Sequence, residues 1–526
     1  MNRTTTRRFE ILASVLVLSW ALVLQGCFFF SAGALWRDEA NSVLQAQLPA
    51  VKDIWITLQY DSFPVFYPMF LRWWIGFSWT SCDLGLRLLG ALVGLVFLAS
   101  VWVVPRILGS RIPIILVFLL SASPLFISEV QSVRPYGVGM LGLLWLFGCL
   151  GRYLLSPAAV WLWLASIASV ITVQSSYANA LFVGCLSVSA SSSALLQRRR
   201  GSAVLILIPG FVAALSLIPY VNTLQRAGSW VAMVHYQVDW KLFWEGLLCA
   251  FSPAFPMVWI ALTVSAIVCG MRWRQTRSDP AAFKPPLILY ATLAGVLGVV
   301  VQVLFIEFIK VPPFPRYFLA SLTLIACAVE MLLQKADPRF RVLTALCALL
   351  LMAWPSWTWL HLRRTNVDQV AIVLSREAAK DDLIVISPWF LHTSFQRYYR
   401  GSSSWITVPP LQQEPIMRYD LIMREILQPE PGSGIGRALR AALDRKAAVW
   451  LVSQVTAKDA FVSEAPRLPA VPQNPNGYDY VRFRSFWERE IRHRLNECCS
   501  REEWPLPNAG PLWDEEHLLL SRWRAK

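Results

Sequence analysis

The sequence has few charged residues for its length. Asp, Glu, Lys and Arg make up 15% of its 526 residues, whereas 56% are hydrophobic and the mean hydropathy is +0.48. Because about 25% of the residues of a soluble domain are charged, this composition excludes an ordinary soluble protein. It predicts a membrane protein.

The sequence also lacks the common metal-binding and repeat patterns. None of its ten cysteines forms a C-x-x-C pair, and no cluster of His and Cys suggests a zinc site. Most cysteines lie in apolar runs, where Cys behaves as a small hydrophobic residue. The adjacent Cys498 and Cys499 in the polar tail have no evident role, and we find no internal repeat.

Positive charge is plentiful but unevenly placed. The net charge is +15, and the basic residues gather in short segments between apolar runs. This bias is typical of a polytopic membrane protein whose basic loops face the cytoplasm. It makes nucleic acid a poor candidate partner, and we expect membrane lipids instead.

About eleven apolar runs approach the roughly 20 residues needed to cross a bilayer. They are 9–33, 84–105, 112–128, 137–155, 159–176, 178–196, 202–220, 246–270, 286–307, 317–334 and 341–360. Another run, 64–79, is short, rich in aromatic residues and interrupted by Arg72, which favours a helix lying in the membrane interface. If it does not cross, all dense basic clusters between spans fall on one side. These clusters are Arg106 with Arg111, Arg152, Arg198–Arg200, Arg272 to Lys284, and Lys335 to Arg341.

This topology predicts a first external loop over 34–83 and an external tail. The tail has the pattern of a soluble α/β domain. We expect helices near 366–380, 389–399 and 434–446, and strands at 383–386, 405–408 and 448–452. The expected organisation is a polytopic α-helical membrane module over 1–360 and an extracytoplasmic α/β domain over 361–526.

Several charged residues fall on the predicted outer side, where the topological bias does not favour arginine. They are Asp38 and Glu39 after the first span, Asp61 before the 64–79 helix, Arg87, Glu129, Arg134 with Tyr136, and Arg316 with Tyr317. Arginine binds phosphate through a bidentate fork, and a carboxylate can take a proton or hold a divalent cation. Together they suit an anionic lipid headgroup.

Each of these residues also has a structural interpretation. Asp38 and Glu39 suit the N-terminus of a helix over 40–48, and Asp61 with Ser62 suits the cap of the next helix. Arg134 could reach lipid phosphates from a turn, and Arg316 with Tyr317 could anchor a span in the interface. Only their joint placement on one side favours a functional site.

The order of these motifs resembles the GT-C membrane glycosyltransferases, in particular the dolichyl-phosphate-mannose protein mannosyltransferases and the bacterial lipid A aminoarabinose transferase. The tail looks like the C-terminal domain of some bacterial members. Four features between residues 9 and 335 carry the resemblance. They are the Asp-Glu pair, the Asp61-x-x-Pro64-x-x-Tyr67 stretch, Arg87 between two leucines, and Ser123-Pro124-Leu125-Phe126 leading to Arg134-Pro135-Tyr136.

The resemblance implies that Asp38 is a catalytic base or a metal-site carboxylate with Glu39 beside it, and that Arg87 and Arg134 lie near a donor phosphate. One divalent cation (Mg, Mn or Zn) or none is compatible with it. It also implies a bacterial cytoplasmic membrane protein whose site faces outward. Relatives commonly have His-Pro-Pro where this chain has Phe63-Pro64-Val65, so the polar contact of that histidine is missing.

A transferase with an external site needs a lipid-carried donor, because nucleotide sugars are not supplied outside the cytoplasm. We therefore expect sugar transfer from a polyprenyl phosphate to a lipid, glycan or protein acceptor, with Asp38 as the base. Two alternatives stay open. A transporter or flippase of a lipid-linked saccharide would favour charges at mid-bilayer depth and two related halves. A non-catalytic envelope scaffold is compatible with the change at Phe63.

Overall fold

The protein divides into two compact units, which we describe separately. The computed structural model describes residues 3–109, 112–231, 240–251, 255–275, 285–309, 313–334, 336–411, 414–454, 466–470, 480–507 and 510–526. The first unit is Met1–Phe30, Ser62–Asn222 and Gln237–Leu360, and the second is Ser31–Asp61, Thr223–Tyr236 and His361–Lys526. The segment that follows the first apolar helix therefore belongs to the same unit as the C-terminal residues.

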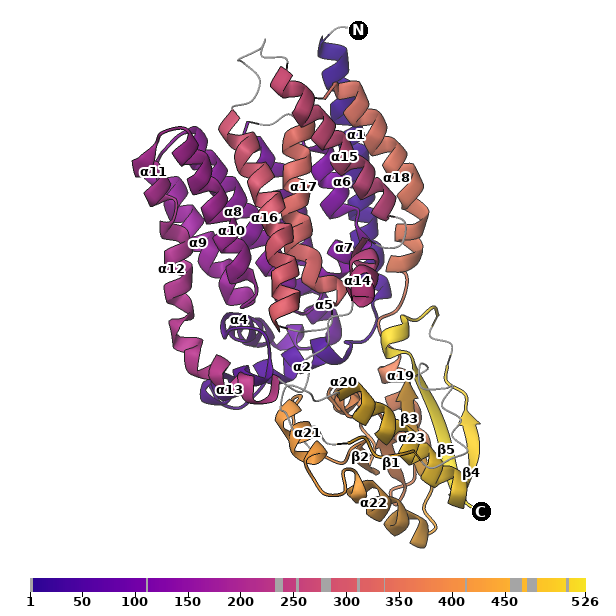
Figure 1. Ribbon diagram of the computed structural model, residues 1–526. Coiled ribbons are helices and arrows are strands. Elements are labelled where there is room, and N and C mark those ends of the chain that lie inside the picture. Colours follow the sequence, from indigo (N-terminus) through magenta and orange to yellow (C-terminus); the bar gives the residue numbers. More distant parts are fainter. Residues whose placement is uncertain are drawn as a thin grey trace. The chain divides into compact units, whose positions relative to one another are not determined.

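The first unit is a bundle of apolar helices (Figure 1). They are α1 (Arg3–Ser31), α4 (Phe66–Ile75), α5 (Asp83–Ile107), α6 (Ile114–Ser121), α7 (Pro124–Val130), α8 (Tyr136–Leu155), α9 (Ala159–Ser175), α10 (Asn179–Leu196), α11 (Arg200–Leu205), α12 (Ile208–Leu217), α14 (Trp240–Phe251), α15 (Phe255–Gln275), α16 (Pro285–Ile309), α17 (Leu319–Leu333) and α18 (Pro338–Leu360), with the short 3₁₀ helices η2 (Ser78–Thr80), η3 (Ile218–Tyr220) and η5 (Pro315–Phe318). Helix α13 (Val221–Val231) includes residues of both units. Large apolar side chains such as Met257 and Leu350 are about four-fifths exposed, as expected for a surface that faces lipid.

The predicted membrane character is confirmed. Eight described helical segments are long and apolar enough to cross a membrane, or nine if the bent pair α14 and α15 forms one span. Two further predicted runs are helical but shorter. Residues 112–128 are divided into α6 and α7 by a break before Pro124, and α9 has 17 residues. All eleven predicted runs are thus mainly helical in their described residues, and the chain is an integral membrane protein.

Helix α4 is too short to cross a membrane. Its ten residues extend for about 15 Å at 1.5 Å per residue, which supports the interfacial prediction for 64–79. Trp73 and Trp79, in α4 and η2, are 59% and 63% exposed, as is typical of aromatic residues at a membrane surface. The predicted cap by Asp61 and Ser62 is wrong, because the residue that precedes α4 is Val65 and it makes no side-chain capping bond.

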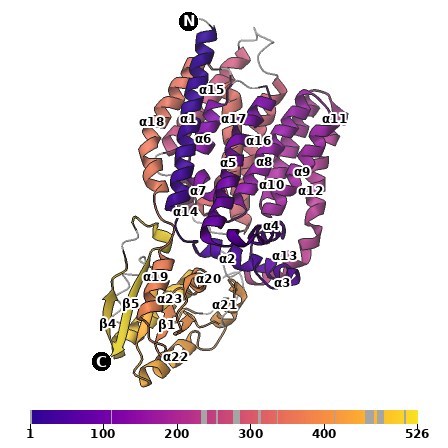
Figure 2. The same cartoon turned by 180° about the vertical axis from the view of Figure 1, so that it is seen from behind.

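A fully buried arginine joins three helices of the first unit. The Arg341 guanidinium of α18 donates to Glu10 Oε1 of α1 at 3.2 Å and to Glu330 Oε1 of α17 at 2.8 Å. It also donates to the Ile112 carbonyl at 2.7 Å. Helices α1 and α18 lie side by side from both directions of view (Figures 1 and 2). Arg341 therefore pairs inside the bundle, and its predicted place in a basic cytoplasmic loop is wrong. Four other members of the predicted basic clusters, Arg111, Arg277, Lys284 and Lys335, lie outside the described residues.

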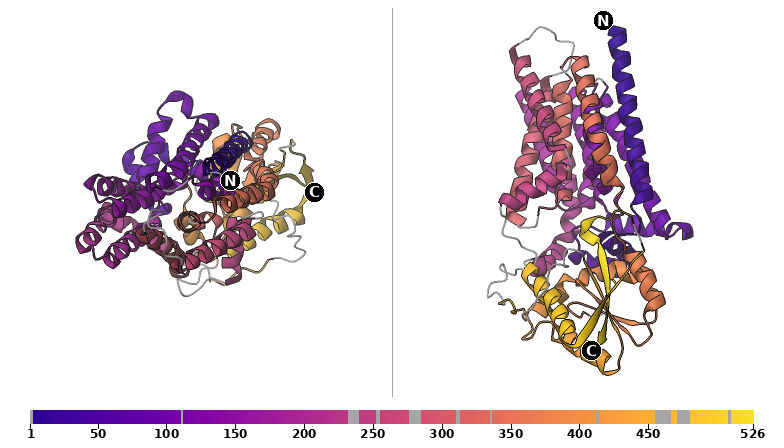
Figure 3. Two further views of the ribbon diagram at one scale, coloured as in Figure 1. Left: turned by 90° about the horizontal axis from the view of Figure 1, so that it is seen from above. Right: turned by 90° about the vertical axis from the view of Figure 1, so that its right-hand side faces the viewer.

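The second unit contains a five-stranded mixed sheet, which the right-hand view of Figure 3 shows nearly edge-on, with its strands fanned over one another. The strand order is β2 (Ser404–Thr407), β1 (Leu383–Ile386), β3 (Val449–Gln454), β5 (Leu518–Ala525) and β4 (Cys499–Trp504). Strands β2, β1 and β3 are parallel, whereas β5 and β4 are antiparallel to their neighbours. The other elements are α2 (Arg37–Ala46), α3 (Val51–Thr57), η1 (Leu58–Tyr60), α19 (Val367–Glu377), η6 (Trp389–Leu391), α20 (His392–Tyr398), α21 (Tyr419–Ile426), α22 (Ser433–Asp444), α23 (Tyr480–Cys498) and η9 (Asp514–Glu516).

The parallel half of this sheet agrees with the sequence prediction. Every residue of β1 and β3 is buried, as expected for parallel strands covered on both faces. Strand β1 has the predicted bounds, and β2 begins and ends one residue earlier than predicted. The three predicted helices are also present, within one residue of the predicted ranges, as α19, η6 with α20, and α22. The sequence analysis missed α21, α23, β4 and β5.

Candidate functional site

Asp38 and Glu39 lie in the first turn of α2, where the helix dipole favours negative charge. The structural interpretation of this pair as part of a helix N-terminus is thus correct, although the helix begins three residues earlier than predicted. Asp38 is half-buried, and the Nε atom of Arg37 lies 3.4 Å from its Oδ1. Glu39 is fully buried. Asp38 is therefore the more exposed carboxylate of the pair.

The backbone around Arg37 is held by the C-terminal part of the second unit. Its N–H donates to Glu516 Oε2 at 2.9 Å, and its carbonyl accepts from the Thr393 hydroxyl at 3.1 Å. The Arg37 guanidinium lies 4.3 Å from the centre of the Phe390 ring, within the range of a cation–π contact. Two residues earlier, the Leu35 N–H donates to the Tyr398 hydroxyl at 2.7 Å.

Glu516 is a buried carboxylate that receives several hydrogen bonds. Besides the Arg37 N–H, its Oε1 accepts from the Ser394 hydroxyl at 3.0 Å, and the Thr365 side chain is a further donor. Burial raises the pKa of Glu516 to about 7, although the hydrogen bonds and the positive charge of Arg37 act in the opposite direction. The hydrogen bonds and Arg37 thus offset only part of the desolvation of the Glu516 carboxylate.

Asp61 lies at the other end of the same segment, directly after η1. Its N–H donates to the Leu58 carbonyl at 3.2 Å, and its side chain is half-buried. The preceding residue, Tyr60, is held by the C-terminal part of the unit: its hydroxyl donates to Asp420 at 3.4 Å, and the Arg418 guanidinium lies 4.6 Å from its ring centre. Segment 31–61 is thus fixed to the C-terminal residues near both of its ends.

Arg134 and Tyr136 lie in the first unit, at the turn between α7 and α8. Arg134 is 7% exposed, and its guanidinium is 4.5 Å from the centre of the Phe63 ring. The Phe63 and Tyr136 rings meet edge to face at 5.6 Å. Phe63 is therefore an aromatic partner of the arginine. No pattern in the sequence predicted this contact.

Arg316 and Tyr317 of η5 belong to the same cluster. The Tyr136 phenol interacts electrostatically with Arg134, Arg316, Tyr317 and Glu129. The Arg316 guanidinium also lies 4.6 Å from the centre of the Phe314 ring. Residues separated by nearly 190 positions in the sequence thus gather at one end of the bundle. This cluster contains two guanidinium groups and one carboxylate, so its net charge is positive.

Arg87 lies one turn into α5 and is 5% exposed. Its helix approaches the α7–α8 turn closely at Gly90, where an added Cβ would overlap the Gln131 carbonyl oxygen. Glycine is needed at this position because only a residue without a side chain lets the two backbones meet. Gly90 thereby brings the first turns of α5 next to the segment that carries Arg134, a role that the sequence analysis missed.

We expect Gly90→Ala to destabilise the first unit. The new methyl group meets backbone rather than a movable side chain, so α5 or the α7–α8 turn must shift, at a cost of about 1–3 kcal/mol. Thermal unfolding of the full chain in detergent measures this loss. Gly184→Ala in α10 is the matched control, because nothing lies within 4 Å of its Cβ position and alanine favours a helix. Equal unfolding temperatures for the two variants would contradict the close approach.

The predicted site residues therefore form two groups. Arg134, Tyr136, Arg316 and Tyr317 cluster in the first unit, which also contains Arg87. Asp38 and Glu39 are neighbours in the second unit, and Asp61 ends the same segment. The convergence of Asp38 with Arg134 stays a prediction.

Among the described residues, no group of three or more His, Cys, Asp or Glu side chains could hold a metal ion. Asp38 and Glu39 thus provide two carboxylates without a third such ligand in the described part of the chain.

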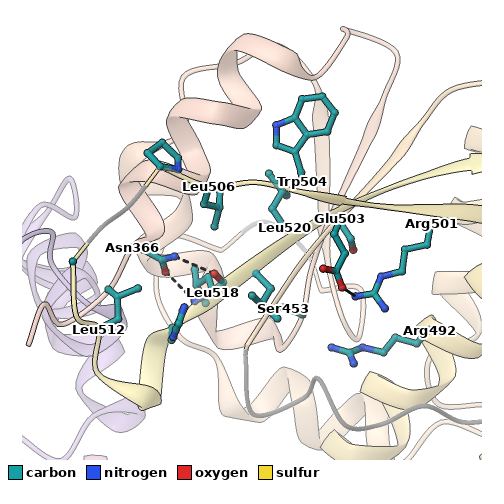
Figure 4. A pocket seen from close by; sticks show the side chains of 15 residues that line it. Asn366, Ser453, Arg492, Arg501, Glu503, Trp504, Leu506, Leu512, Leu518 and Leu520 are labelled. Atoms are coloured by element: carbon teal, nitrogen blue, oxygen red, sulfur yellow. Dashed lines mark hydrogen bonds and ion pairs between the residues drawn. The ribbon is translucent and has the colours of Figure 1, made fainter.

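A cavity of about 310 Å³ lies in the second unit beside β4 and β5 (Figure 4). Its polar lining is largely used within the protein. Asn366 exchanges two hydrogen bonds with the Leu518 backbone, at 3.0 and 2.9 Å, and Arg501 pairs with Glu503 at 3.0 Å. The described lining includes none of the predicted site residues.

Comparison with solved structures finds similar chains, two of which are structures of ArnT. The chain is similar to ArnT from Cupriavidus metallidurans bound to undecaprenyl phosphate, with a TM-score of 0.49 and 11% identity over 97% of each chain. For ArnT in the apo state, the TM-score is 0.36 and the identity is 12% over 84% of this chain and 93% of that one. No protein-family model and no curated protein matches. ArnT is a lipid A aminoarabinose transferase, one of the enzymes that the motif order resembles. At this sequence identity and TM-score, the roles of residues in ArnT cannot be assigned to residues of this chain. The function proposed below is therefore argued from the residues of this chain.

Proposed function

We propose that the protein is an integral-membrane glycosyltransferase that moves a sugar from a polyprenyl phosphate to an acceptor on the extracytoplasmic side. The observation that carries this proposal is the gathering of Arg134 and Arg316 around Tyr136. Two guanidinium groups and the single carboxylate of Glu129 give this apolar end of the bundle a net positive charge. Guanidinium groups match the geometry of a phosphate and bind it through a bidentate fork.

The proposed reaction is a single displacement at the anomeric carbon of the donor. An acceptor hydroxyl attacks this carbon, the bond from carbon to the phosphate oxygen breaks, and the bonding electrons leave with the phosphate. Arg134 and Arg316 stabilise the negative charge that develops on the leaving group. Asp38 takes the acceptor proton as the attack proceeds. Because the phosphate is a good leaving group, the reaction needs no general acid.

Several features support the individual roles. Asp38 is half-buried, and its carboxylate lies beside the Arg37 guanidinium. Arg87 lies one turn into α5, the helix that approaches the α7–α8 turn, so we assign it to donor binding with Arg134. The acceptor is a lipid, glycan or protein. The one-sided distribution of basic residues supports a bacterial cytoplasmic membrane location with this site facing outward.

The test compares cells with and without the chain. Mass analysis of carrier lipids and envelope glycans should show one sugar that leaves the polyprenyl phosphate and appears on an acceptor only when the protein is present. The purified protein in detergent, given that labelled carrier lipid, should then form the same glycosidic bond. Movement of labelled lipid between leaflets without a new glycosidic bond would indicate a transporter. If neither the carrier lipids nor the envelope glycans change, the result would favour a non-catalytic envelope scaffold.

A further inference from the structure

Helix α2 begins without a capping side chain of its own. Its N-cap residue is Trp36, which makes no side-chain capping bond, although the first N–H groups of a helix need acceptors. The Arg37 N–H donates instead to Glu516 at 2.9 Å, across 479 positions of sequence. A carboxylate there is also favoured by the helix dipole. Glu516 thus takes the place of the missing cap.

Glu516 is itself fixed on several sides. It is 1% exposed, and the hydroxyl of Ser394 donates to its Oε1 at 3.0 Å. Ser394 follows Thr393 in α20, and the Thr393 hydroxyl donates to the Arg37 carbonyl at 3.1 Å. Two consecutive residues of α20 therefore hold the two partners of one hydrogen bond: Ser394 binds the Glu516 carboxylate, and Thr393 binds the backbone of Arg37.

These bonds act on the backbone immediately before Asp38. The Arg37 carbonyl belongs to the peptide group whose nitrogen is that of Asp38, so Thr393 and Glu516 hold the chain on both sides of the Arg37 Cα. The Arg37 guanidinium lies on the Phe390 ring and beside Asp38. The position of the Asp38 carboxylate is thereby coupled to side chains of the C-terminal residues.

We propose that Glu516 is a positioning residue, which holds the first turn of α2 so that Asp38 is placed for proton transfer. This inference rests on the proposed function, because it assumes that Asp38 is the base. A shift of about 1 Å in a reacting group can cost up to 100-fold in rate. Loss of Glu516 should therefore reduce turnover even in molecules that remain folded.

The test measures sugar transfer by the full chain in detergent with Glu516→Ala and Glu516→Gln. We expect Glu516→Ala to lower kcat per folded molecule by about tenfold or more, with the KM for the carrier lipid unchanged within twofold. Glu516→Gln should lose less, since its amide oxygen can still accept from the Arg37 N–H. Glu503→Gln is the matched control: it removes a carboxylate from β4 whose side chain is 67% exposed, and it should leave both constants unchanged.

A purely structural role would give a different result. Glu516→Ala would then reduce the folded fraction, while kcat per folded molecule stayed that of the wild type. That result overturns the inference, as would equal losses for the Ala and Gln variants.

Amide hydrogen exchange separates this inference from the proposed function. We expect exchange over Arg37–Ala46 to become faster in Glu516→Ala while exchange over β1 and β3 stays slow. If the wild-type chain transfers no sugar, the proposed function fails, yet faster exchange still supports the role of Glu516 in holding α2. Unchanged exchange overturns that role whether or not the chain transfers sugar.

Discussion

Asp38→Asn should abolish detectable sugar transfer, with a fall in rate of about 10²–10⁴-fold, the usual contribution of a general base. Asparagine has nearly the same shape as aspartate and is tolerated in the first turn of a helix. Its amide cannot take the acceptor proton, so only the chemical step should suffer. The measurement is transfer from labelled polyprenyl-phosphate sugar in membranes, normalised to the amount of folded protein.

The matched control is Asp381→Asn, which neutralises an exposed carboxylate of the same unit. It should transfer sugar at the wild-type rate. Carrier lipid should still bind to Asp38→Asn, because the proposed phosphate ligands Arg134 and Arg316 are intact. Undiminished transfer by Asp38→Asn would remove this residue from the mechanism.

The largest expected effect on stability is that of Arg341→Met. Arg341 is 0% exposed and pairs with Glu10 and Glu330, so its removal leaves two carboxylates buried without their cation. Breaking a buried ion pair on one side costs about 3–5 kcal/mol. Thermal unfolding in detergent should show a large fall in midpoint for this variant.

Two comparisons identify the cause. Arg339→Met changes an exposed arginine two residues earlier in α18, and it should leave the midpoint within error of the wild type. Adding Glu10→Gln and Glu330→Gln to Arg341→Met should restore most of the loss, because no buried charge then lacks a partner. If the triple variant is as unstable as the single one, packing rather than charge accounts for the effect of Arg341.

The parts of the fold that the sequence predicts are those in which one local pattern dominates. Long apolar runs gave the helices of the first unit, and the Leu-Ile-Val-Ile run of β1 lies where predicted. Helix α23 was missed because its sequence is polar and rich in arginine. Strand β4 was missed for a similar reason, since four of its six residues are exposed.

The contacts of the site depend on tertiary structure that no local pattern records. Arg341 resembles other basic residues between apolar runs, and only the folded chain places it between Glu10 and Glu330. Glu516 stands in an Asp-Glu-Glu stretch that is typical of a solvated surface. Its partner, Arg37, is almost the whole length of the chain away. The clustering of Arg134 with Arg316 was predicted because both are arginines on the side where the topological bias does not favour them.

The edge strand β4 of the mixed sheet affects how the protein behaves at high concentration. Among the described residues, strand β4 pairs with β5 alone, and Arg501, Glu502 and Glu503 of this edge strand are exposed. A second molecule that added a strand along this edge would have to bring its own charged groups against these side chains. Strand β4 thus opposes edge-to-edge pairing of sheets from two molecules, even when the protein is concentrated.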